Sequence, residues 1–429
     1  RGVHWTLKIC CKSLTAFSVP AIQRLLGLVL AARVLAGLVF GSACLAEDWP
    51  RFRGPDNNGV SQETDWNANW SSDGPPIDWR VDVGTGYSSV VIAKGRLYTL
   101  GNEENVDTVY CLDAETGEEI WTYAYQCATD ANEFEGGPTS TPTIAQGSVF
   151  TLSRVGDLFC FDAQSGDIKW RVNVPDLTSI RTPGWGFSGA PWVIDGLVVV
   201  NVGDAGVALS IKDGSVSWAS ADKDSGYSSF VPLVQGGEDR LIFGSARSYV
   251  CVDARTGTER WRQRWLTTFG CNATNPIVVN GQVFLSSGYN RGSALLDFKE
   301  GNPVVVWKTK EFQNQLASAV YFNGLLYGPN GSVAEGATLA CLRLQDGKVL
   351  WNAVDENVGG LAAAGEYLIT ISDEGMLKII KPTQLGPEVV SQYKVFDEQC
   401  WTVPVLCNGR IYCRGAGGAL VCVNVRKTN

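Results

Sequence analysis

The polar and apolar positions of this chain repeat in one order along its length. Each unit opens with a glycine-rich stretch, continues with two short apolar runs joined by a turn, and closes with two alternating runs joined by a second turn. The first turn reads AKG, AQG, IDG, VNG, FNG or CNG, and residues 137–153, 270–287 and 400–415 show the runs on both sides of it. Alternation with a period of two, bounded by glycine and asparagine turns, predicts antiparallel β-strands. We therefore expect four strands in each unit.

The second turn carries the most regular part of the repeat. The sequence YCLDAETGEEIW at 110–121 returns as FCFDAQSGDIKW, which ends at Trp170, and as VCVDARTGTERW, which ends at Trp261. Looser copies end at Trp218 and Trp351. A glycine holds the same turn position in five copies, where a positive φ is cheapest without a Cβ atom. These glycines are Gly117, Gly166, Gly214, Gly257 and Gly347.

Tryptophan closes the last strand of seven units, at intervals of 42 to 49 residues, and an eighth, degenerate copy ends near Tyr393. Repeats of this length with several short strands per unit are typical of a β-propeller. We therefore predict an all-β, eight-bladed propeller of four-stranded antiparallel blades. A single sheet cannot bury both of its faces, and an indole at a fixed place in each unit fills the gap to the next blade. The tryptophans expected in these seams are Trp79, Trp121, Trp170, Trp218, Trp261, Trp307 and Trp351.

The two ends of the repeat array complement each other. Residues 75–82 read as a fourth strand without a preceding three, and residues 399–424 read as three strands without a fourth. Pairing them gives eight complete blades and leaves no bare end unit, which an open array would have to cap. We therefore predict a ring closed by its N- and C-terminal segments. The propeller domain then spans 75–429, and a clip segment spans 47–74.

The sequence WPRFRG at 49–54, within the clip segment, has two interpretations. It either packs Trp49 and Phe52 on the ring, with Arg51 or Arg53 bonding carbonyl groups, or it forms an exposed recognition arm. Tryptophan and phenylalanine side chains that are exposed together are uncommon. This favours the packed clip.

Residues 1–46 differ from the rest of the chain in composition. They hold five basic residues and no acidic residue, and an apolar run from Val34 to Ala46 follows Arg33. This pattern is typical of an export signal with a cleavage site near Ala46. A membrane-spanning helix is the alternative, but Arg33 near its middle would be costly. We expect an exported protein of the periplasm or cell envelope, with no membrane span in the mature chain.

Charge and histidine content argue against several classes of function. The net charge is −9, and removal of the basic first 46 residues leaves a more acidic chain. Phosphate backbones repel such a chain, so nucleic acid is not an expected partner. The one histidine, His4, lies in the export signal. The mature chain therefore lacks Ser-His-Asp and Cys-His nucleophile systems and histidine-ligated zinc or iron, and we expect no metal site.

Ten cysteines follow Ala46, and five of them occupy one place in the repeat, two residues before the aspartate or its substitute. Equivalent places in different blades lie far apart, so we expect these five to be small buried apolar residues. They are Cys111, Cys160, Cys251, Cys341 and Cys422. Cys407 and Cys413 flank an Asn-Gly turn, but a two-residue turn would place Cys407 opposite Arg410, which disfavours a disulfide between them. The pairing of Cys127, Cys271 and Cys400 stays open.

The eleven-residue frame that ends in tryptophan resembles the repeat of pyrroloquinoline-quinone (PQQ) propellers. The segments DWPRFRGPDNNGVS at 48–61 and GWGFSGAP at 184–191 are similar to segments of bacterial PQQ-like repeat proteins, which are exported eight-bladed propellers. The resemblance covers residues 47–429. It leaves two roles open, because this fold serves quinoprotein alcohol dehydrogenases and also non-enzymatic scaffolds such as the lipoprotein of the outer-membrane β-barrel assembly machinery. In the first repeat the matching residues are Cys111, Asp113, Thr116, Gly117 and Trp121, with cysteine in place of the usual alanine.

The dehydrogenase role implies features that this sequence lacks. Quinoprotein dehydrogenases hold PQQ between a tryptophan and a disulfide of adjacent cysteines, and they bind Ca²⁺ through Glu, Asn and Asp. The adjacent pair Cys10-Cys11 lies in the export signal, and some relatives carry histidines where this chain has Gln315 and Val403. We therefore expect a non-catalytic binding or assembly scaffold without a cofactor. A PQQ- and calcium-dependent alcohol dehydrogenase is the alternative.

The glycine-rich opening of each unit is expected to line the ring axis, because the innermost strand of each blade comes first. Aromatic, amide and guanidinium groups there suit a sugar, a quinone or a peptide, unless they merely line a water-filled channel. The expected partner is a protein or a small polar ligand in the central channel or on a ring face, and a carbohydrate-binding module is a third possible role. Trp185 and Trp401 are the strongest candidates, since they are tryptophans outside the seams. The candidate lining residues are Tyr87, Ser88, Arg181, Trp185, Tyr227, Ser228, Asn272, Asn275, Asn314, Gln315 and Trp401.

Overall fold

The computed structural model describes residues 1–2, 48–130, 136–220, 225–332, 335–354 and 356–427. The export signal expected at 1–46 therefore falls, apart from its first two residues, outside the described part of the chain. Residues 47–429 form one compact unit, so the clip segment and the propeller belong together. No helix in the described ranges has the length and apolar character needed to cross a membrane.

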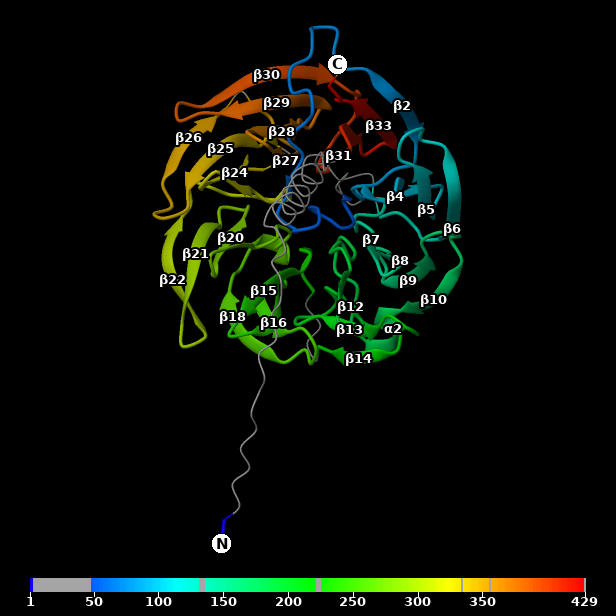
Figure 1. The fold of residues 1–429 in the computed structure, drawn as a ribbon, viewed down its shortest axis with the longest axis vertical. Coiled ribbons are helices and arrows are strands. Elements are labelled where there is room, and N and C mark those ends of the chain that lie inside the picture. The colour runs from blue at the N-terminus through cyan, green and yellow to red at the C-terminus, as the bar shows by residue number, and fades with distance from the viewer. Residues whose placement is uncertain (3–47, 131–135, 221–224, 333–334, 355, 428–429) are drawn as a thin grey trace. The chain divides into compact units, whose positions relative to one another are not determined.

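The compact unit is the eight-bladed β-propeller that the repeat predicts, with each blade a four-stranded antiparallel sheet (Figure 1). In blades 1 to 7 the strands follow one another in chain order from the axis to the rim. Blades 1 and 2 contain β3 (Val91–Ala93), β4 (Arg96–Glu103), β5 (Val106–Asp113) and β6 (Glu119–Gln126), then β7 (Thr143–Ala145), β8 (Ser148–Leu152), β9 (Asp157–Asp162) and β10 (Ile168–Asn173). Blades 3 and 4 contain β11 (Trp192–Ile194), β12 (Leu197–Val200), β13 (Val207–Ser210) and β14 (Val216–Ala219), then β15 (Val231–Gln235), β16 (Glu238–Gly244), β17 (Ser248–Asp253) and β18 (Glu259–Arg264).

The remaining blades follow the same plan, and the last one joins both ends of the repeat array. Blades 5 and 6 contain β19 (Ile277–Val279), β20 (Gln282–Ser287), β21 (Gly292–Lys299) and β22 (Asn302–Thr309), then β23 (Val320–Phe322), β24 (Leu325–Asn330), β25 (Thr338–Arg343) and β26 (Val349–Ala353). Blade 7 contains β27 (Gly360–Ala364), β28 (Tyr367–Ile371), β29 (Met376–Pro382) and β30 (Pro387–Lys394), with the short β1 (Val60–Ser61) parallel to β27. Blade 8 contains β31 (Val405–Cys407), β32 (Arg410–Arg414), β33 (Ala419–Asn424) and β2 (Ile77–Asp82). The described helices are α2 (Val174–Thr178) and the 3-10 turn η1 (Thr268–Gly270).

Each seam between blades is built from the tryptophan of one blade and the turn glycine of the next, which confirms the predicted role of the repeat. A Cβ atom placed on Gly117 would lie 2.7 Å from an indole carbon of Trp79, so only glycine lets the ring pack this closely. The indole Nε1–H of Trp79 also donates to the carbonyl of Ala114 in the same turn. The same indole–glycine contact recurs for Trp121 with Gly166, Trp170 with Gly214, Trp218 with Gly257 and Trp307 with Gly347.

Three seams deviate from this rule. The indole of Trp351 donates to the carbonyl of Thr383 at 3.0 Å in the turn of blade 7, but a Cβ atom on Gly386 of that turn would meet nothing within 4 Å. The Nε1 group of Trp261 is buried without a partner among the described residues, and the ring packs on Phe298 at 5.4 Å. The facing turn in blade 5 contains only two residues, between the paired Lys299 and Asn302, and is shorter than the turns that supply the carbonyl to Trp79 and its equivalents. In the eighth seam Tyr393 replaces the tryptophan, and a Cβ atom on Gly74 would lie 2.1 Å from its ring. The degenerate eighth copy therefore ends in an aromatic ring that fills its seam, as predicted for Tyr393.

The recurrent cysteine is the residue that faces the indole across the outer pair of strands. Cys111 pairs with Trp121 in blade 1, and Cys422 of β33 pairs with Trp79 of β2 in blade 8. The other three repeat cysteines take the same register. All ten cysteines from Cys111 to Cys422 are buried thiols outside any disulfide, as the repeat predicts for five of them. Cys407 lies opposite Arg410, which confirms the two-residue turn between them.

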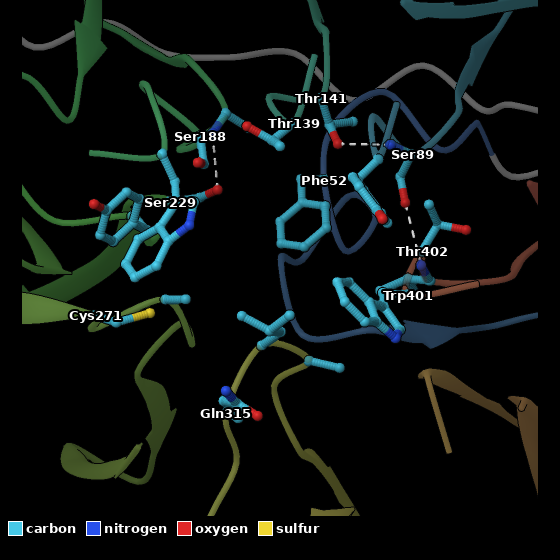
Figure 2. A pocket seen from close by; sticks show the side chains of 18 of the residues that line it. Phe52, Ser89, Thr139, Thr141, Ser188, Ser229, Cys271, Gln315, Trp401 and Thr402 are labelled. Carbon is cyan, nitrogen blue, oxygen red and sulfur yellow. Dashed lines mark hydrogen bonds between the residues drawn. The ribbon is translucent and has the colours of Figure 1, made fainter. Parts of the chain in front are cut away.

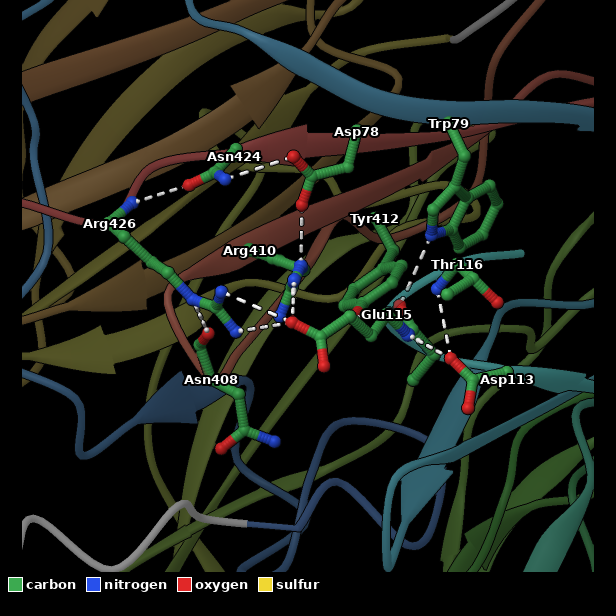
Figure 3. Close-up of polar contacts among 11 residues, drawn as sticks. Asp78, Trp79, Asp113, Glu115, Thr116, Asn408, Arg410, Tyr412, Asn424 and Arg426 are labelled. Carbon is green, nitrogen blue, oxygen red and sulfur yellow. Dashed lines mark hydrogen bonds and ion pairs between the residues drawn. The ribbon is translucent and has the colours of Figure 1, made fainter. Parts of the chain in front are cut away.

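Strand β2 closes the ring by pairing with β33, as predicted from the two ends of the array. A polar cluster reinforces this junction (Figure 3). Arg410 of β32 contacts Asp78 of β2 at 2.7 Å and Glu115 of blade 1 at 2.6 Å. Asn424 of β33 donates a second hydrogen bond to Asp78 at 2.9 Å. One guanidinium group thus ties the N-terminal strand, the C-terminal blade and the neighbouring blade together.

The stretch 49–59, which we call the crossing segment, passes over the centre of the ring and contacts the innermost strands of six blades. Trp49 exchanges backbone hydrogen bonds with Ile92 of blade 1, and Arg51 lies 4.6 Å from the ring centre of Trp192 in blade 3. The buried guanidinium of Arg53 donates to the carbonyls of residues 318 and 319 at 3.2 and 2.7 Å. Further backbone and amide contacts reach blades 2, 4 and 7. The packed clip is therefore the correct interpretation, with Trp49 only 1% exposed.

Candidate functional site

A cavity of about 230 Å³ lies on the axis of the ring (Figure 2). Its walls come from the glycine-rich openings of seven blades, and Phe52 of the crossing segment forms its floor. We call the end of the ring that carries these openings the mouth. Because the crossing segment spans the other end, the cavity is a pocket that opens at the mouth.

Six of the eleven predicted lining residues line this cavity. Tyr87 and Ser89 face the cavity, whereas Ser88 between them is fully buried in its blade. Side chains of successive residues in an extended chain point to opposite faces, so Ser88 points away from the axis where Tyr87 and Ser89 point towards it. Our prediction of both Tyr87 and Ser88 as lining residues was therefore wrong for one of them. The six lining residues are Tyr87, Trp185, Tyr227, Asn275, Gln315 and Trp401.

Three of the other predicted residues make structural hydrogen bonds, within their own blade or to the preceding one. Ser228 accepts a hydrogen bond from the backbone of Gly244 at 2.6 Å. The amide of Asn272 donates to the carbonyl of Ser245 at 2.8 Å, and that of Asn314 donates to the carbonyl of Pro329 at 2.7 Å. Arg181 is an exposed residue of the loop before Trp185 and is not part of the cavity wall. The residues placed incorrectly in the channel are therefore Ser88, Arg181, Ser228, Asn272 and Asn314.

Small polar side chains around the cavity form an inner belt of hydrogen bonds between blades. Ser89 N–H donates to Thr141 Oγ1 at 3.1 Å, and Ala190 N–H donates to Ser229 Oγ at 2.9 Å. The belt continues as Ser229 N–H donates to Asn275 Oδ1 at 2.9 Å, and Asn275 N–H donates to Ser318 Oγ at 2.8 Å. These backbone groups face a neighbouring blade without a paired strand, so the side chains satisfy donors that would otherwise be buried alone.

Two aromatic groups face each other across the cavity. On one side Tyr87 and Trp401 are stacked at 5.2 Å, and the hydroxyl of Tyr87 donates to Gln399 at 2.8 Å. The indole Nε1–H of Trp401 is held by Asp373. On the other side Trp185 packs edge-on against Tyr227 at 5.7 Å. Since the polar tips of the first pair are bonded, its rings form a fixed apolar wall.

Sequence reasoning missed Phe269, which extends the second aromatic group out of the cavity. Its ring is 73% exposed and packs edge-on against Trp185 at 5.9 Å and against Tyr289 at 6.1 Å. Its backbone has φ 62°, a left-handed conformation that costs a bulky residue free energy. The sequence TTFGC around it shows no turn signal at this position, so only the backbone geometry distinguishes it from other surface residues.

The ionisable groups of the cavity are neutral or paired at neutral pH. Burial raises the pKa of Cys271 to about 11 and that of Tyr227 to about 12. Cys271 is therefore a thiol and a poor nucleophile. At the rim, Arg154 contacts Asp130 at 2.8 Å. The buried thiol of Cys271 and the phenol of Tyr227 therefore stay protonated at neutral pH.

The described lining does not fit the PQQ–calcium arrangement that the quinoprotein resemblance implies. Asp130 is the one carboxylate among the described lining residues, and Arg154 already pairs with it. Cys271 is the one lining cysteine in the described ranges, and its sequence neighbours are Gly270 and Asn272, so no adjacent pair is present there. Among the described lining residues, only the aromatic walls match that arrangement, because their tryptophans Trp185 and Trp401 could stack on a flat ring.

Comparison with known proteins identifies relatives in both branches of this fold. The sequence model of the family described as outer membrane protein assembly factor BamB matches residues 107–353. BamB of Yersinia pestis is 22% identical over 367 residues, which cover 81% of this chain and 88% of that protein. The quinohemoprotein alcohol dehydrogenase ADH-IIG of Pseudomonas putida is 27% identical over 134 residues, 30% of this chain and 17% of that enzyme.

Solved structures agree on the fold. BamB from Moraxella catarrhalis aligns with a TM-score of 0.62 at 15% identity, covering 82% of this chain and 99% of that one. A europium-containing methanol dehydrogenase aligns with a TM-score of 0.63 at 14% identity, covering 88% and 89%. At such low identity these structures show the shared propeller and nothing more specific. The family assignment rests on the sequence match, which spans more than half of the chain: this protein belongs to the family of the outer membrane protein assembly factor BamB.

Proposed function

We propose that this protein is exported to the cell envelope and acts there as a non-catalytic scaffold that binds other proteins at the mouth of its ring. The basic and apolar pattern of residues 1–46 supports export. Relatives named outer membrane protein assembly factors support a role in protein assembly. The acidic composition continues to argue against nucleic acid as a partner.

Phe269 is the observation that carries this proposal. A phenylalanine that is 73% exposed and has a positive φ is unfavourable on both counts in the isolated protein. It stands beside the cavity and is held in place by two cavity-lining rings, Trp185 and Tyr289. Exposed aromatic side chains on a rigid support are typical centres of protein interfaces. A binding role at the mouth explains why the chain keeps this residue.

The cavity chemistry supports binding rather than catalysis. The described lining has a neutral thiol at Cys271, tyrosines whose pKa is raised by burial, and the ion pair of Arg154 with Asp130. The thiol and the tyrosines keep their protons at neutral pH, so they are not poised for the proton transfer that general acid–base catalysis requires. A scaffold needs only shape and fixed polar groups, and the two aromatic walls provide them.

Replacing Phe269 with glycine separates a binding role from a structural one. Glycine relieves the positive φ but makes the unfolded chain more flexible, so we expect the free energy of unfolding to change by less than about 1 kcal/mol. In a strain that lacks this gene, we expect the wild-type chain to restore the level of folded outer-membrane β-barrel proteins and the Phe269→Gly chain to fail at equal abundance. Full rescue by the Phe269→Gly chain would contradict the proposal that Phe269 is part of a protein-binding surface.

A PQQ- and calcium-dependent alcohol dehydrogenase is the second candidate, because relatives of that class share the propeller. Incubation of the purified protein with PQQ and Ca²⁺, followed by measurement of alcohol-dependent dye reduction, separates the two. We expect no turnover above that of a matched sample with Trp185 and Trp401 replaced by leucine. Turnover that depends on these two residues would contradict the scaffold proposal.

A further inference from the structure

The connection between blades 4 and 5 presents an apolar and basic surface at the mouth of the ring. Its exposed residues include Leu266, which is 45% exposed, and Phe269, which is 73% exposed. Arg264, the last residue of the outermost strand β18, is also exposed, whereas Trp265 after it is fully buried. The connection runs inward from this strand to Phe269, which packs against the cavity residue Trp185. Two apolar side chains are therefore open to solvent on one connection, with a cation at its outer end.

A second arginine reaches the same place from blade 5. Arg291 belongs to the loop between β20 and β21, and its guanidinium lies 3.8 Å from the ring centre of Trp265. The same loop contains Tyr289, whose ring packs against Phe269 at 6.1 Å. We call Arg264 and Arg291 the arginine pair, because both adjoin Trp265. The exposed apolar residues of the connection therefore have a cation from each of two blades beside them.

The charge of the arginine pair is not balanced by a carboxylate of the described residues. Arg262, two residues earlier on β18, forms an ion pair with Asp204 at 2.8 Å. Arg264 and Arg291 form no ion pair within the described ranges, although the whole chain has a net charge of −9. The arginine pair is thus a local departure from an acidic composition. An anionic group on a partner can supply the countercharge.

The shape of these groups indicates which anion fits. A guanidinium is planar and can bind a carboxylate through two parallel hydrogen bonds. The stack on Trp265 orients the plane of Arg291 in advance, so this side chain loses little freedom when it binds. Leu266 and Phe269 add apolar area that a partner can cover, and rigid aromatic residues of this kind are typical interface centres. A long phosphate polymer, in contrast, would be repelled by the acidic chain as a whole.

From these observations we infer that the surface formed by Leu266, Phe269 and the arginine pair binds a segment of a partner protein in which carboxylates flank apolar side chains. The apolar side chains of the segment cover Leu266 and Phe269, and its carboxylates pair with the two arginines. This inference rests on the proposed function, and it adds the charge and polarity of the segment that the scaffold recognises.

Two matched peptides test the inference directly. One is acetyl-Asp-Leu-Asp-Phe-Asp-amide, and the other has asparagine in place of each aspartate, both with 4-fluorophenylalanine for detection by ¹⁹F NMR. In about 20 mM NaCl we expect the aspartate peptide to bind the full chain with a dissociation constant of about 1 mM, at least about fivefold tighter than the asparagine peptide. The net negative charge of the chain works against this order, so only a local basic surface produces it. In about 0.3 M NaCl the difference should largely disappear.

Charge reversal at Arg264 is the decisive variant, because this side chain is exposed and has no ion pair within the described ranges. Arg264→Glu should weaken binding of the aspartate peptide at least about fivefold and leave the unfolding midpoint unchanged. Lys299→Glu is the matched control, because it makes the same change in charge at an exposed site. Lys299 lies at the turn between β21 and β22, at the end of the ring opposite the mouth. This control should bind both peptides like the wild type.

Four results would overturn the inference. They are binding of the asparagine peptide as tight as that of the aspartate peptide, equal effects of Arg264→Glu and Lys299→Glu, and the absence of peptide binding at several millimolar. The fourth is binding to phosphatidylglycerol vesicles that Arg264→Glu abolishes, which would assign the surface to anionic lipid. Each can occur while Phe269→Gly still fails to rescue outer-membrane protein levels. In that case this inference fails and the scaffold proposal stands.

Discussion

At the scale of single residues, the turn glycine of each repeat serves two purposes at once. Gly166 has φ 78°, which the sequence alone indicates for a tight turn, and it also lies directly under the indole of Trp121. A Cβ atom there would lie 2.6 Å from the ring. The second purpose explains why a glycine accompanies a tryptophan of the preceding blade, although the two are far apart in sequence.

Blade 2 offers a matched pair of glycines to separate these purposes. Gly147 also has a positive φ, at 74°, but a Cβ atom there would meet nothing within 4 Å. We expect Gly147→Ala to lower the free energy of unfolding by about 1 kcal/mol through backbone strain. Gly166→Ala should cost about 1–3 kcal/mol more, because it also displaces the indole. Urea unfolding measures both, and equal losses would show that the indole contact is not what requires the glycine.

At the scale of elements, strand β2 depends on residues that come from the far end of the chain. Burial acts to raise the pKa of Asp78, but the hydrogen bonds from Arg410 and Asn424 and the charge of Arg410 outweigh it, so the pKa lies below its ordinary value. The depressed pKa means that the ionised carboxylate stabilises the closed ring. The contribution is fully present above the unfolded pKa of about 4 and is lost as the pH falls through the folded pKa.

Asp78→Asn tests this contribution to ring closure. At pH 7 we expect the variant to lose about 1–3 kcal/mol of unfolding free energy, since Arg410 is largely buried and loses a charged partner. The difference from the wild type should shrink as the pH is lowered below about 4. Asp65→Asn, which removes the exposed pair with Lys427, should change little at either pH. A pH-independent effect of Asp78→Asn would show that the charge does not hold the strand.

At the scale of the whole molecule, the crossing segment converts a ring of separate blades into a closed-ended pocket. It reaches six blades with eleven residues, and Phe52 at its centre becomes the floor of the cavity. Arg53 anchors it: burial lowers the pKa of this guanidinium to about 10, so it stays charged at neutral pH and bonds the carbonyls of Asn58, Ser318 and Ala319. The N-terminal stretch therefore supports both the stability and the site.

Arg53→Met and Arg51→Met form a matched test of this anchor. Methionine keeps most of the apolar stem in both cases. Loss of the Arg53 donors leaves buried carbonyls unpaired, and we expect a loss of about 2–4 kcal/mol in urea unfolding. Arg51 contributes a cation–π contact with Trp192, so its replacement should cost less than about 1 kcal/mol. Equal effects of the two variants would contradict the anchoring role of Arg53.

Local patterns in the sequence were sufficient to predict the blades, the seams and the closure. The period of Trp79 and its equivalents, the turn glycines and the complementary ends at 75–82 and 399–424 each report a constraint that acts within one repeat or between neighbouring repeats. The tryptophan recurs in seven units and the turn glycine in five, so these constraints are visible without a structure. The sequence also indicated which segments reach the axis, and it singled out Trp185 and Trp401.

The tertiary structure alone decided which side chains of those segments face the cavity. The extended segment before β3 turns Tyr87 inward and Ser88 into the blade, and a shift by one residue would exchange them. The hydrogen bond from Ser229 to Asn275, the ring contacts of Phe269 and the floor at Phe52 each depend on contacts between distant segments. Each of these features occurs once in the ring, so no recurring sequence pattern indicates it. The sequence determined how the blades are made and joined, and the packing of blade against blade determined what the pocket can bind.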